Sequence, residues 1–269
     1  MFSVLLSVYY NESPYYFRQS IDSLFNQSLQ LAEVVLVKDG ELTPELENVI
    51  TEYTAKYLQI RVVPLKQNQG LGKALNEGLK HCSYDLVARM DTDDIAKPDR
   101  FEKQIRVFQE HPELDVVGAW IDEFEETTSN IISTRKLPEV HDDICQFAKK
   151  RNPFNHPCVM YKKSAVEAVG SYQDFYLLED YYLWLRMLMA GYQGYNIQEP
   201  LLHMRAGSDM YLRRAGWKYA KTQARLFKFM KSQGFIGKGQ YIKSCVIRSG
   251  SALAPNWLRK FMFEKVLRK

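Results

Sequence analysis

The 269-residue sequence has few cysteines, and it lacks an apolar run of about 18 residues that would predict a membrane-spanning helix. It begins directly on an apolar stretch, without the basic start and small-residue cleavage site of a signal peptide. The four cysteines lie far apart and form no C-x-x-C pair, which argues against structural zinc and fits a reducing compartment. These absences together predict a cytosolic protein.

The phosphate-binding loops of two nucleotide-dependent enzyme classes are missing as well. A dinucleotide-dependent dehydrogenase needs G-x-G-x-x-G after its first strand, and residues 7–14 contain no glycine. A sugar nucleotidyltransferase would carry a glycine-rich loop with a basic residue after Val8, and that loop is absent too. Both classes are therefore disfavoured.

Charge is unevenly distributed along a chain of ordinary composition. Hydrophobic residues make up 46% and charged residues 25% of the sequence, as in average soluble globular proteins. From Leu201 to the end there are 16 basic and 2 acidic residues, against 20 basic and 30 acidic in the first 200. Such a basic tail predicts an anionic partner (membrane surface, lipid phosphate or nucleic acid) or, alternatively, a solvated helical face.

The first 95 residues alternate between short apolar runs typical of buried strands and amphipathic stretches typical of helices. Two helices begin on the same signal, a hydroxyl N-cap followed by proline, at Ser13-Pro14 and Thr43-Pro44. The alternation predicts parallel strands joined by right-handed crossovers, with ligands at the carboxyl ends of the strands. The predicted strands are 2–8, 33–38, 60–65 and 85–90, and the predicted helices are 13–27, 43–57 and 71–81.

The rest of the chain is less regular. Strands are predicted at 116–124, 131–137 and 158–161, and helices at 98–111, 140–149 and 179–190. After about Ser208 the pattern is helical only, with breaks near 234–239 and 249–255. We therefore expect one α/β domain followed by a helical C-terminal extension.

The sharpest local motif is Asp91-Thr92-Asp93-Asp94, which directly follows an apolar strand. Carboxylates one residue apart at a strand end can point into one crevice and hold a hard divalent cation. Mg²⁺ and Mn²⁺ favour oxygen ligands and are commonly shared with substrate phosphates. The alternative is a polar turn with helix-capping aspartates, because short motifs often match by chance.

Two further interpretations of this motif stay open at the level of sequence. An aspartate-nucleophile phosphohydrolase also places D-x-D at a strand end with Mg²⁺, but normally on its first strand and with a threonine shortly afterwards. Here the motif follows the fourth predicted strand, and Ile95 comes after Asp94. A catalytically inert nucleotide- or membrane-binding module is the other alternative, and it predicts that Asp93 and Asp180 could be lost without consequence.

Four ordered stretches in the N-terminal half together resemble glycosyltransferase family 2, whose members have a GT-A fold. The stretch around Asp91 takes the position of the family's D-x-D motif. The similarity is closest to transferases of bacterial polysaccharide assembly, of the amylovoran and O-antigen kind. The matching stretches are Ser7-Val8-Tyr9 with Asn11-Glu12, Val35 to Gly40, Asn68 to Gly78, and Ala88 to Asp94.

The resemblance assigns donor-binding roles at the strand ends. Asp39 would accept a hydrogen bond from the nucleobase, and Lys38 departs from the acidic residue that many relatives carry there. Asp93 would ligate the metal ion directly, with Asp91 near the ribose or the metal. The other donor-binding residues are Ser7, Tyr9, Lys73 and Arg205. The alternative is an ordinary exposed lysine for Lys73 and a structural salt bridge for Arg205.

A second motif, the Glu179-Asp180 pair, resembles the family's E-D motif, which supplies the catalytic base in inverting members. Asp180 would take the proton from the acceptor hydroxyl and Glu179 would position the acceptor, with the reverse assignment as the alternative. Two acids at a helix start also complement the helix dipole, so a structural role is the alternative. Asn155 and His156 are predicted either to contact the acceptor or to be ordinary hydrogen-bonded loop residues.

Aromatic residues in the basic tail suit amphipathic helices at an anionic membrane or, alternatively, helices packed onto the catalytic body. These aromatic residues are Trp217, Tyr219, Phe227, Phe229, Trp257, Phe261 and Phe263.

The sequence thus predicts a GT-A α/β catalytic domain over 1–207 and a basic helical extension over 208–269. Residues 1–95 would bind the nucleotide-sugar and residues 96–207 the acceptor. The resemblance implies an inverting, Mn²⁺- or Mg²⁺-dependent transfer of a hexose, glucose or galactose, from a UDP-sugar to an undecaprenyl-diphosphate-linked saccharide. The protein would serve O-antigen, lipopolysaccharide or exopolysaccharide synthesis in the cytoplasm, peripheral to the inner membrane face, without binding nucleic acid.

Overall fold

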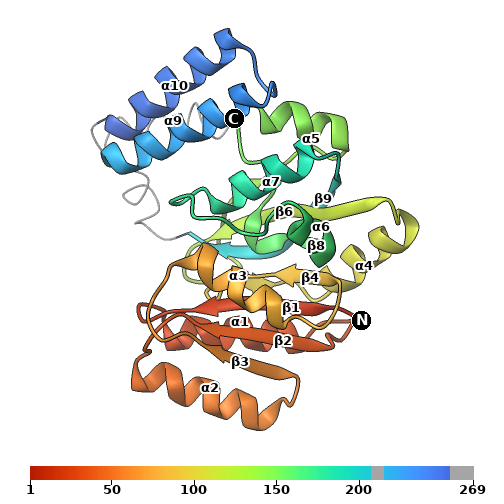
Figure 1. Ribbon diagram of the computed structural model, residues 1–269. Coiled ribbons are helices and arrows are strands. Elements are labelled where there is room, and N and C mark those ends of the chain that lie inside the picture. The colour runs from red at the N-terminus through yellow and green to blue at the C-terminus, as the bar shows by residue number, and fades with distance from the viewer. Residues whose placement is uncertain (207–214, 255–269) are drawn as a thin grey trace.

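A computed structural model describes residues 1–206 and 215–254 (Figure 1). Strands and helices alternate in the first half, as the sequence predicts. The strands are β1 (Ser3–Val8), β2 (Glu33–Lys38), β3 (Ile60–Pro64), β4 (Leu86–Arg89) and β5 (Ile95–Ala96). The helices are α1 (Pro14–Phe25), α2 (Pro44–Lys56), α3 (Leu71–His81) and α4 (Arg100–Glu110).

The second half completes the sheet and adds helices on one side of it. Its strands are β6 (Leu114–Phe124), β7 (Ile131–Arg135), β8 (Met160–Lys162) and β9 (Gln193–Arg205). Its helices are α5 (His141–Ala148), the short 3₁₀ helix η1 (His156–Cys158), α6 (Lys163–Ala168), α7 (Glu179–Met189), α9 (Gly216–Ser232) and α10 (Lys238–Leu253). The predicted boundary at 207/208 and the tail aromatics Trp257, Phe261 and Phe263 lie outside the described residues.

One mixed sheet connects both halves, in the order β3-β2-β1-β4-β8-β6-β9-β5, with β7 paired to β6. The first four strands are parallel, as predicted from their alternation with helices. Strand β8 then runs antiparallel to both β4 and β6, while β9 runs parallel to β6. The carboxyl ends of β1, β2 and β4 therefore share one edge of the sheet.

The apolar strands are buried on both faces because successive side chains point to opposite sides. Leu5, Val35 and Val37 pack in one core cluster with α3 and α7. The neighbouring residues Val4 and Leu36 pack in a second cluster with α1, α2 and α4. The sheet thus lies between two layers of helices, and its polar strand ends remain at the edge (Figure 1).

The predicted hydroxyl caps set the starts of α1 and α2. Ser13 Oγ accepts a hydrogen bond from the backbone N–H of Tyr16 at 3.4 Å, and Thr43 Oγ1 accepts one from Leu46 at 3.3 Å. In both helices proline occupies the first turn, where no N–H partner is needed. These predictions are confirmed.

Strands β5 and β9 and helix α6 are absent from the predicted pattern. The sequence of β9 mixes polar and apolar residues and contains Gly194 and Pro200, so it lacks the alternation of a half-buried strand. Pairing with β6 and β5 makes it a strand. This pairing brings Arg205, at the end of β9, beside the Asp91 motif.

The C-terminal helices α9 and α10 lie against α5 and α7, seen at the top of Figure 1. Leu226, Phe227 and Met230 of α9 are buried in the core cluster that also contains Tyr181 and Trp184 of α7. The described part of the extension therefore packs on the catalytic body. Across residues 1–206 and 215–254, none of the helices is both long enough and apolar enough to span a bilayer.

Candidate active site

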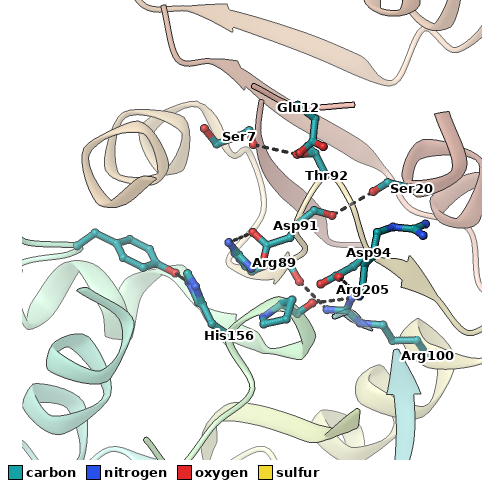
Figure 2. Close-up of polar contacts among 12 residues, drawn as sticks. Ser7, Glu12, Ser20, Arg89, Asp91, Thr92, Asp94, Arg100, His156 and Arg205 are labelled. Atoms are coloured by element: carbon teal, nitrogen blue, oxygen red, sulfur yellow. Dashed lines mark hydrogen bonds and ion pairs between the residues drawn. The ribbon is translucent and has the colours of Figure 1, made fainter. Parts of the chain in front are cut away.

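Three strand ends meet near the Asp91 motif, and Figure 2 shows Ser7, at the end of β1, in contact with Thr92 of the motif. The N–H of Asp39 donates to Val8 O at 2.8 Å, which ties the end of β2 to the end of β1. Thr92 Oγ1 lies 3.5 Å from the carbonyl oxygen of Ser7, which ties β1 to the motif that follows β4. The parallel order of the strands therefore brings together residues that lie up to 85 positions apart.

Asp39 is buried and holds the loop that leads into α3. Its carboxylate accepts hydrogen bonds from the backbone N–H groups of Gln69 (2.7 Å) and Gly70 (3.0 Å). Gly40 allows the close approach, since its φ is +89° and a Cβ there would lie 2.6 Å from Asn68 N. Each carboxylate oxygen has a second lone pair, so contact with a nucleobase stays a prediction compatible with this geometry.

The other residues predicted to bind the donor lie around this edge. Lys73 is exposed in the first turn of α3, with its Nζ 3.9 Å from Asp174 Oδ2. Tyr9 is 41% exposed just beyond β1. Their roles in donor binding stay predictions.

The Asp91 motif forms a tight carboxylate cluster. The side-chain oxygens of Asp91, Asp93 and Asp94 lie within 4.8 Å of one another. Burial, helped by the charges of Asp91 and Glu12, raises the pKa of Asp93 to about 7. A divalent cation would offset this concentration of negative charge, and oxygen ligands suit Mg²⁺ and Mn²⁺. The residues present therefore fit such an ion.

Asp94 differs from its two neighbours in being fully buried. Its Oδ1 accepts the backbone N–H of Arg205 at 3.0 Å, and burial raises its pKa well above the usual range. Asp91 and Asp93 are partly exposed, so they are the carboxylates that an ion can reach. Asp94 instead fixes the motif to the end of β9.

Two residues that the sequence analysis did not assign lie beside this cluster. Arg89 is buried and ion-paired with Asp91, while its Nε and Nη1 have no hydrogen-bond partner among the described residues. Glu12 accepts a hydrogen bond from Thr92 Oγ1 at 2.5 Å, and burial raises its pKa. Both belong to the stretches that carry the family resemblance, and Arg89 is a charged residue inside an apolar strand.

Arg205 braces the motif through several contacts at once. Its Nε donates to the backbone oxygen of Asp93 at 3.2 Å, and its Nη2 donates to Gln19 Oε1 at 2.9 Å. Its guanidinium also lies over the rings of Tyr16 (3.7 Å) and Phe124 (4.6 Å). Among the described residues these are hydrogen bonds and cation–π contacts rather than the salt bridge that was the alternative, and contact with a diphosphate stays a prediction.

The Glu179-Asp180 pair begins α7, beside the start of α3. Oδ2 of Asp180 accepts from Asn152 Nδ2 at 2.5 Å, and Oδ1 accepts the N–H of Tyr181 at 2.7 Å. Burial raises the pKa of Asp180, and these two donors oppose the rise. Burial and the charge of Asp180 raise the pKa of Glu179 to about 7. A Cβ on Gly72 would lie 3.2 Å from Glu179 Cβ, so the pair adjoins the first turn of α3.

Asn155 and His156 point into the protein interior. Asn155 Nδ2 donates to Ala119 O at 2.8 Å, and His156 Nε2 lies 3.0 Å from Tyr172 Oη. Burial, together with the charge of Arg89, lowers the pKa of His156 well below its usual value. This burial favours the structural alternative for both residues, and their contact with an acceptor stays a prediction.

The site as a whole has two carboxylate groups, and the charge of the buried Arg89 acts on both of them. One group can hold a cation at the strand ends, beside a helix N-terminus that suits phosphate oxygens. The other presents a carboxylate that can accept a proton. This arrangement suits the transfer of a group from a diphosphate to a hydroxyl.

Comparison with known proteins agrees with this chemistry. Residues 5–170 match the family model described as glycosyl transferase family 2. An uncharacterized glycosyltransferase of Haemophilus influenzae is 46% identical, over 100% of this chain and 99% of its own. An amylovoran biosynthesis glycosyltransferase of Erwinia amylovora is 44% identical, over 98% of both chains. A UDP-Gal:alpha-D-GlcNAc-diphosphoundecaprenol beta-1,3-galactosyltransferase of Escherichia coli is 35% identical, over 100% of this chain and 97% of its own.

Solved glycosyltransferases share the architecture at low sequence identity. S. aureus TarS (residues 1–349) in complex with UDP-GlcNAc has a TM-score of 0.72 at 17% identity, covering 98% of this chain and 76% of that one. The mannosyltransferase PcManGT from Pyrobaculum calidifontis, in complex with GDP-Man and Mn²⁺, has a TM-score of 0.65 at 13% identity, covering 99% and 79%. The predicted GT-A fold is confirmed.

Proposed function

Because the chain belongs to glycosyl transferase family 2, we propose that it transfers a hexose, with inversion, from a UDP-sugar to a saccharide linked to undecaprenyl diphosphate. The observation that carries the proposal is the nearness of two carboxylate groups, Asp91-Asp93 and Glu179-Asp180, since the charge of the buried Arg89 acts on both. Similarity to the galactosyltransferase of E. coli makes UDP-galactose the first donor to test, and similarity to the amylovoran enzyme supports a role in surface polysaccharide synthesis. Family membership gives no support to the phosphohydrolase or the inert module.

On the donor side, Asp91 and Asp93 would hold Mn²⁺ or Mg²⁺, and Asp39 would contact the uracil. Such an ion, when bound, supplies positive charge that stabilises the leaving diphosphate. The loop held by Asp39 and the start of α3 place backbone N–H groups on the same side of the sheet. These groups would fix the nucleotide while the sugar extends toward α7.

On the acceptor side, Asp180 would serve as the base. The acceptor oxygen forms a bond to the anomeric carbon as the bond from that carbon to the diphosphate oxygen breaks, which inverts the configuration. The proton of the acceptor hydroxyl passes to the Asp180 carboxylate. Glu179, next in line toward the donor loop, would position the acceptor.

A transfer assay with purified protein, UDP-sugars and a synthetic lipid-diphosphate-linked acceptor tests the proposal. Asp180→Asn should lower the turnover rate by roughly 10²–10⁴-fold, the usual contribution of a general base, while UDP binding is kept. Asp143→Asn is the matched control, since Asp143 is exposed on α5. Turnover that survives in Asp180→Asn would remove Asp180 from this role.

The basic extension supports a peripheral position on the inner face of the cytoplasmic membrane. Residues 215–254 include eight basic and no acidic residues. Trp217, Ile242 and Val246 are 71%, 61% and 68% exposed, so apolar side chains lie among the exposed lysines. Together they suit an anionic lipid surface. The exposed lysines of these helices are Lys218, Lys221, Lys228, Lys231, Lys238 and Lys243.

Co-sedimentation with vesicles tests this position. The protein should bind vesicles that contain phosphatidylglycerol, bind neutral phosphatidylcholine vesicles more weakly, and release as salt rises. Lys221→Glu/Lys228→Glu and a chain ending at Ala254 should both bind less. The control Lys56→Glu/Lys80→Glu makes the same change of charge on α2 and α3. Equal binding by all four proteins would refute the membrane proposal.

A further inference from the structure

The carboxylate of Asp180 is held on both oxygens, and one of the holding groups comes from a distant part of the chain. The contact to Oδ1 is local, since Tyr181 is the next residue of α7. The contact to Oδ2 comes from Asn152, 28 residues earlier, in the loop between α5 and η1. Asn152 is therefore the side chain that fixes the direction of this carboxylate from outside its own helix.

The amide of Asn152 is itself oriented. Its Oδ1 accepts the backbone N–H of Phe154 at 3.4 Å, so its Nδ2 points toward Asp180. This orientation is required chemically, because an ionised carboxylate only accepts hydrogen bonds. The backbone oxygen of Asn152 accepts from Arg135 Nη2 at 3.4 Å, and Pro153 restricts the backbone that precedes it.

The backbone just before Asn152 is also held by hydrogen bonds from other helices. The last carbonyl groups of α5 and of the turn after it have no partners within the helix, and side chains of α7 and α10 donate to them. The two contacts from α10 join the C-terminal extension to the loop that carries Asn152. The contacts from both helices are Tyr181 Oη to Ala148 O (2.5 Å), Gln240 Nε2 to Lys149 O (3.0 Å) and Arg248 Nη2 to Lys150 O (2.7 Å).

We propose that Asn152 is a positioning residue for transfer, which holds the Asp180 carboxylate in the direction and the charge state that a base needs. The inference rests on the proposed function, in which Asp180 takes the acceptor proton. A hydrogen bond donated to a carboxylate stabilises its ionised form. Besides Asn152 and the N–H of Tyr181, the charged and titratable groups around Asp180 are Glu179 and the phenol of Tyr181 on α7, Arg89 on β4, Arg135 on β7 and Tyr172 before α7.

Removing the Asn152 donor should raise the pKa of Asp180. Without the Asn152 donor, burial acts on Asp180 with less opposition, so the carboxylate protonates at higher pH. In Asn152→Ala, the acidic limb of the pH–turnover profile should move upward by roughly one pH unit, and turnover above that limb should also fall because the carboxylate loses its fixed direction. Asn152→Asp should move it further, because an ionised neighbour cannot donate and repels the base. Asn152→Ser keeps a shorter donor and should lie between Asn152→Ala and the natural chain.

The experiment measures the pH dependence of turnover for the natural chain and these three variants, with melting temperature and UDP affinity measured alongside. Asn130→Ala, on the exposed turn between β6 and β7, is the matched control. UDP affinity should stay within about twofold in every variant, since Asn152 lies on the acceptor side. An unmoved acidic limb in the three Asn152 variants overturns the inference, whether turnover is unchanged or falls together with melting temperature.

The failure of this inference can be told from failure of the proposed function. If Asp180→Asn keeps full turnover, the base assignment is wrong and the role of Asn152 falls with it. If Asp180→Asn is inactive while the Asn152 series keeps the natural profile, only the positioning role is wrong. Asn152→Ser and Asn152→Asp keep the comparison available where Asn152→Ala does not fold.

Discussion

Glu179 and Asp93 are carboxyl groups whose surroundings disfavour their own charge. Burial comes first for each, and a neighbouring carboxylate adds to it, so both have a pKa raised to about 7. The cation that both of them share is Arg89, which is itself buried and paired with Asp91. Such groups lower the stability of the free protein, and are expected where a cation or a substrate will later compensate them.

At this scale we predict that Glu179→Gln stabilises the protein at high pH. Because the folded pKa lies above the unfolded value of about 4.5, the folded chain binds more protons between pH 4.5 and 7. The contribution of Glu179 to the free energy of unfolding therefore falls as pH rises from 4.5 to 7. At pH 8 the variant should be more stable by roughly 2 kcal/mol, after allowing for partial exposure, with no difference near pH 4.

Chemical denaturation at pH 4, 6 and 8 measures this difference. Glu110→Gln is the matched control, because Glu110 is exposed at the end of α4. A Glu179→Gln variant that is less stable than the natural chain at pH 8 would show that the Glu179 carboxylate is compensated in the folded protein.

The residues of the site divide into those the sequence could indicate and those it could not. Asp91, Asp93 and the Glu179-Asp180 pair stand in motifs at the start or end of predicted elements, so their positions followed from local pattern. Asn152 acts on Asp180, which lies 28 residues away, and its sequence neighbours carry no sign of this contact. Arg89 pairs with Asp91 only two residues away, and its charge inside an apolar strand was a signal that the sequence analysis did not use. Burial of His156 likewise depends on Tyr172, which lies 16 residues away.

At the scale of elements, α3 fixes the donor side because it lies unusually close to the sheet. Gly78 makes this approach possible, since a Cβ there would lie 2.5 Å from both Leu5 Cδ1 and Val37 Cγ2. Both neighbours are buried branched side chains in the sheet, so they have little room to move. The start of α3, with the loop held by Asp39, is placed by this contact.

We predict that Gly78→Ala destabilises the protein by about 1–3 kcal/mol through overpacking, despite the better helix propensity of alanine. It should also weaken UDP binding, because α3 must move away from β1 and β2. Gly239→Ala in α10 is the matched control: a Cβ there meets nothing within 4 Å, so it should be neutral or stabilising by about 0.5 kcal/mol. Urea denaturation and UDP titration measure both effects, and equal stabilities of the two variants would contradict the packing argument.

Elements differ in how far the sequence alone predicts them. Helices α1 and α2 carry their own start signals, and the apolar runs of β1 and β2 are long enough to stand out. Strand β9 carries no such pattern. It is a strand because its backbone pairs with β6 and β5, and nothing in its own residues indicates that pairing. Two-residue β5 is too short for any periodicity to appear.

At the scale of the whole molecule, the sheet changes character between its two halves. Parallel order through β4 follows from the alternation of strands and helices, whereas the reversal at β8 depends on long-range pairing with β4 and β6. That reversal places α7 beside α3, so the donor and acceptor carboxylates face the same region. The extension then packs on α5 and α7, and through Gln240 and Arg248 it supports the loop that holds the base.

The central claim, a metal-assisted UDP-sugar site at the strand ends, is tested most directly by calorimetric titration of UDP with and without Mn²⁺. The natural chain should bind UDP roughly tenfold or more tightly with Mn²⁺, because the ion links the diphosphate to the carboxylates. Asp93→Ala should lose this gain while Asp143→Asn keeps it. An equal gain in Asp93→Ala, or folded protein that binds neither UDP, GDP nor dTDP, would contradict the account.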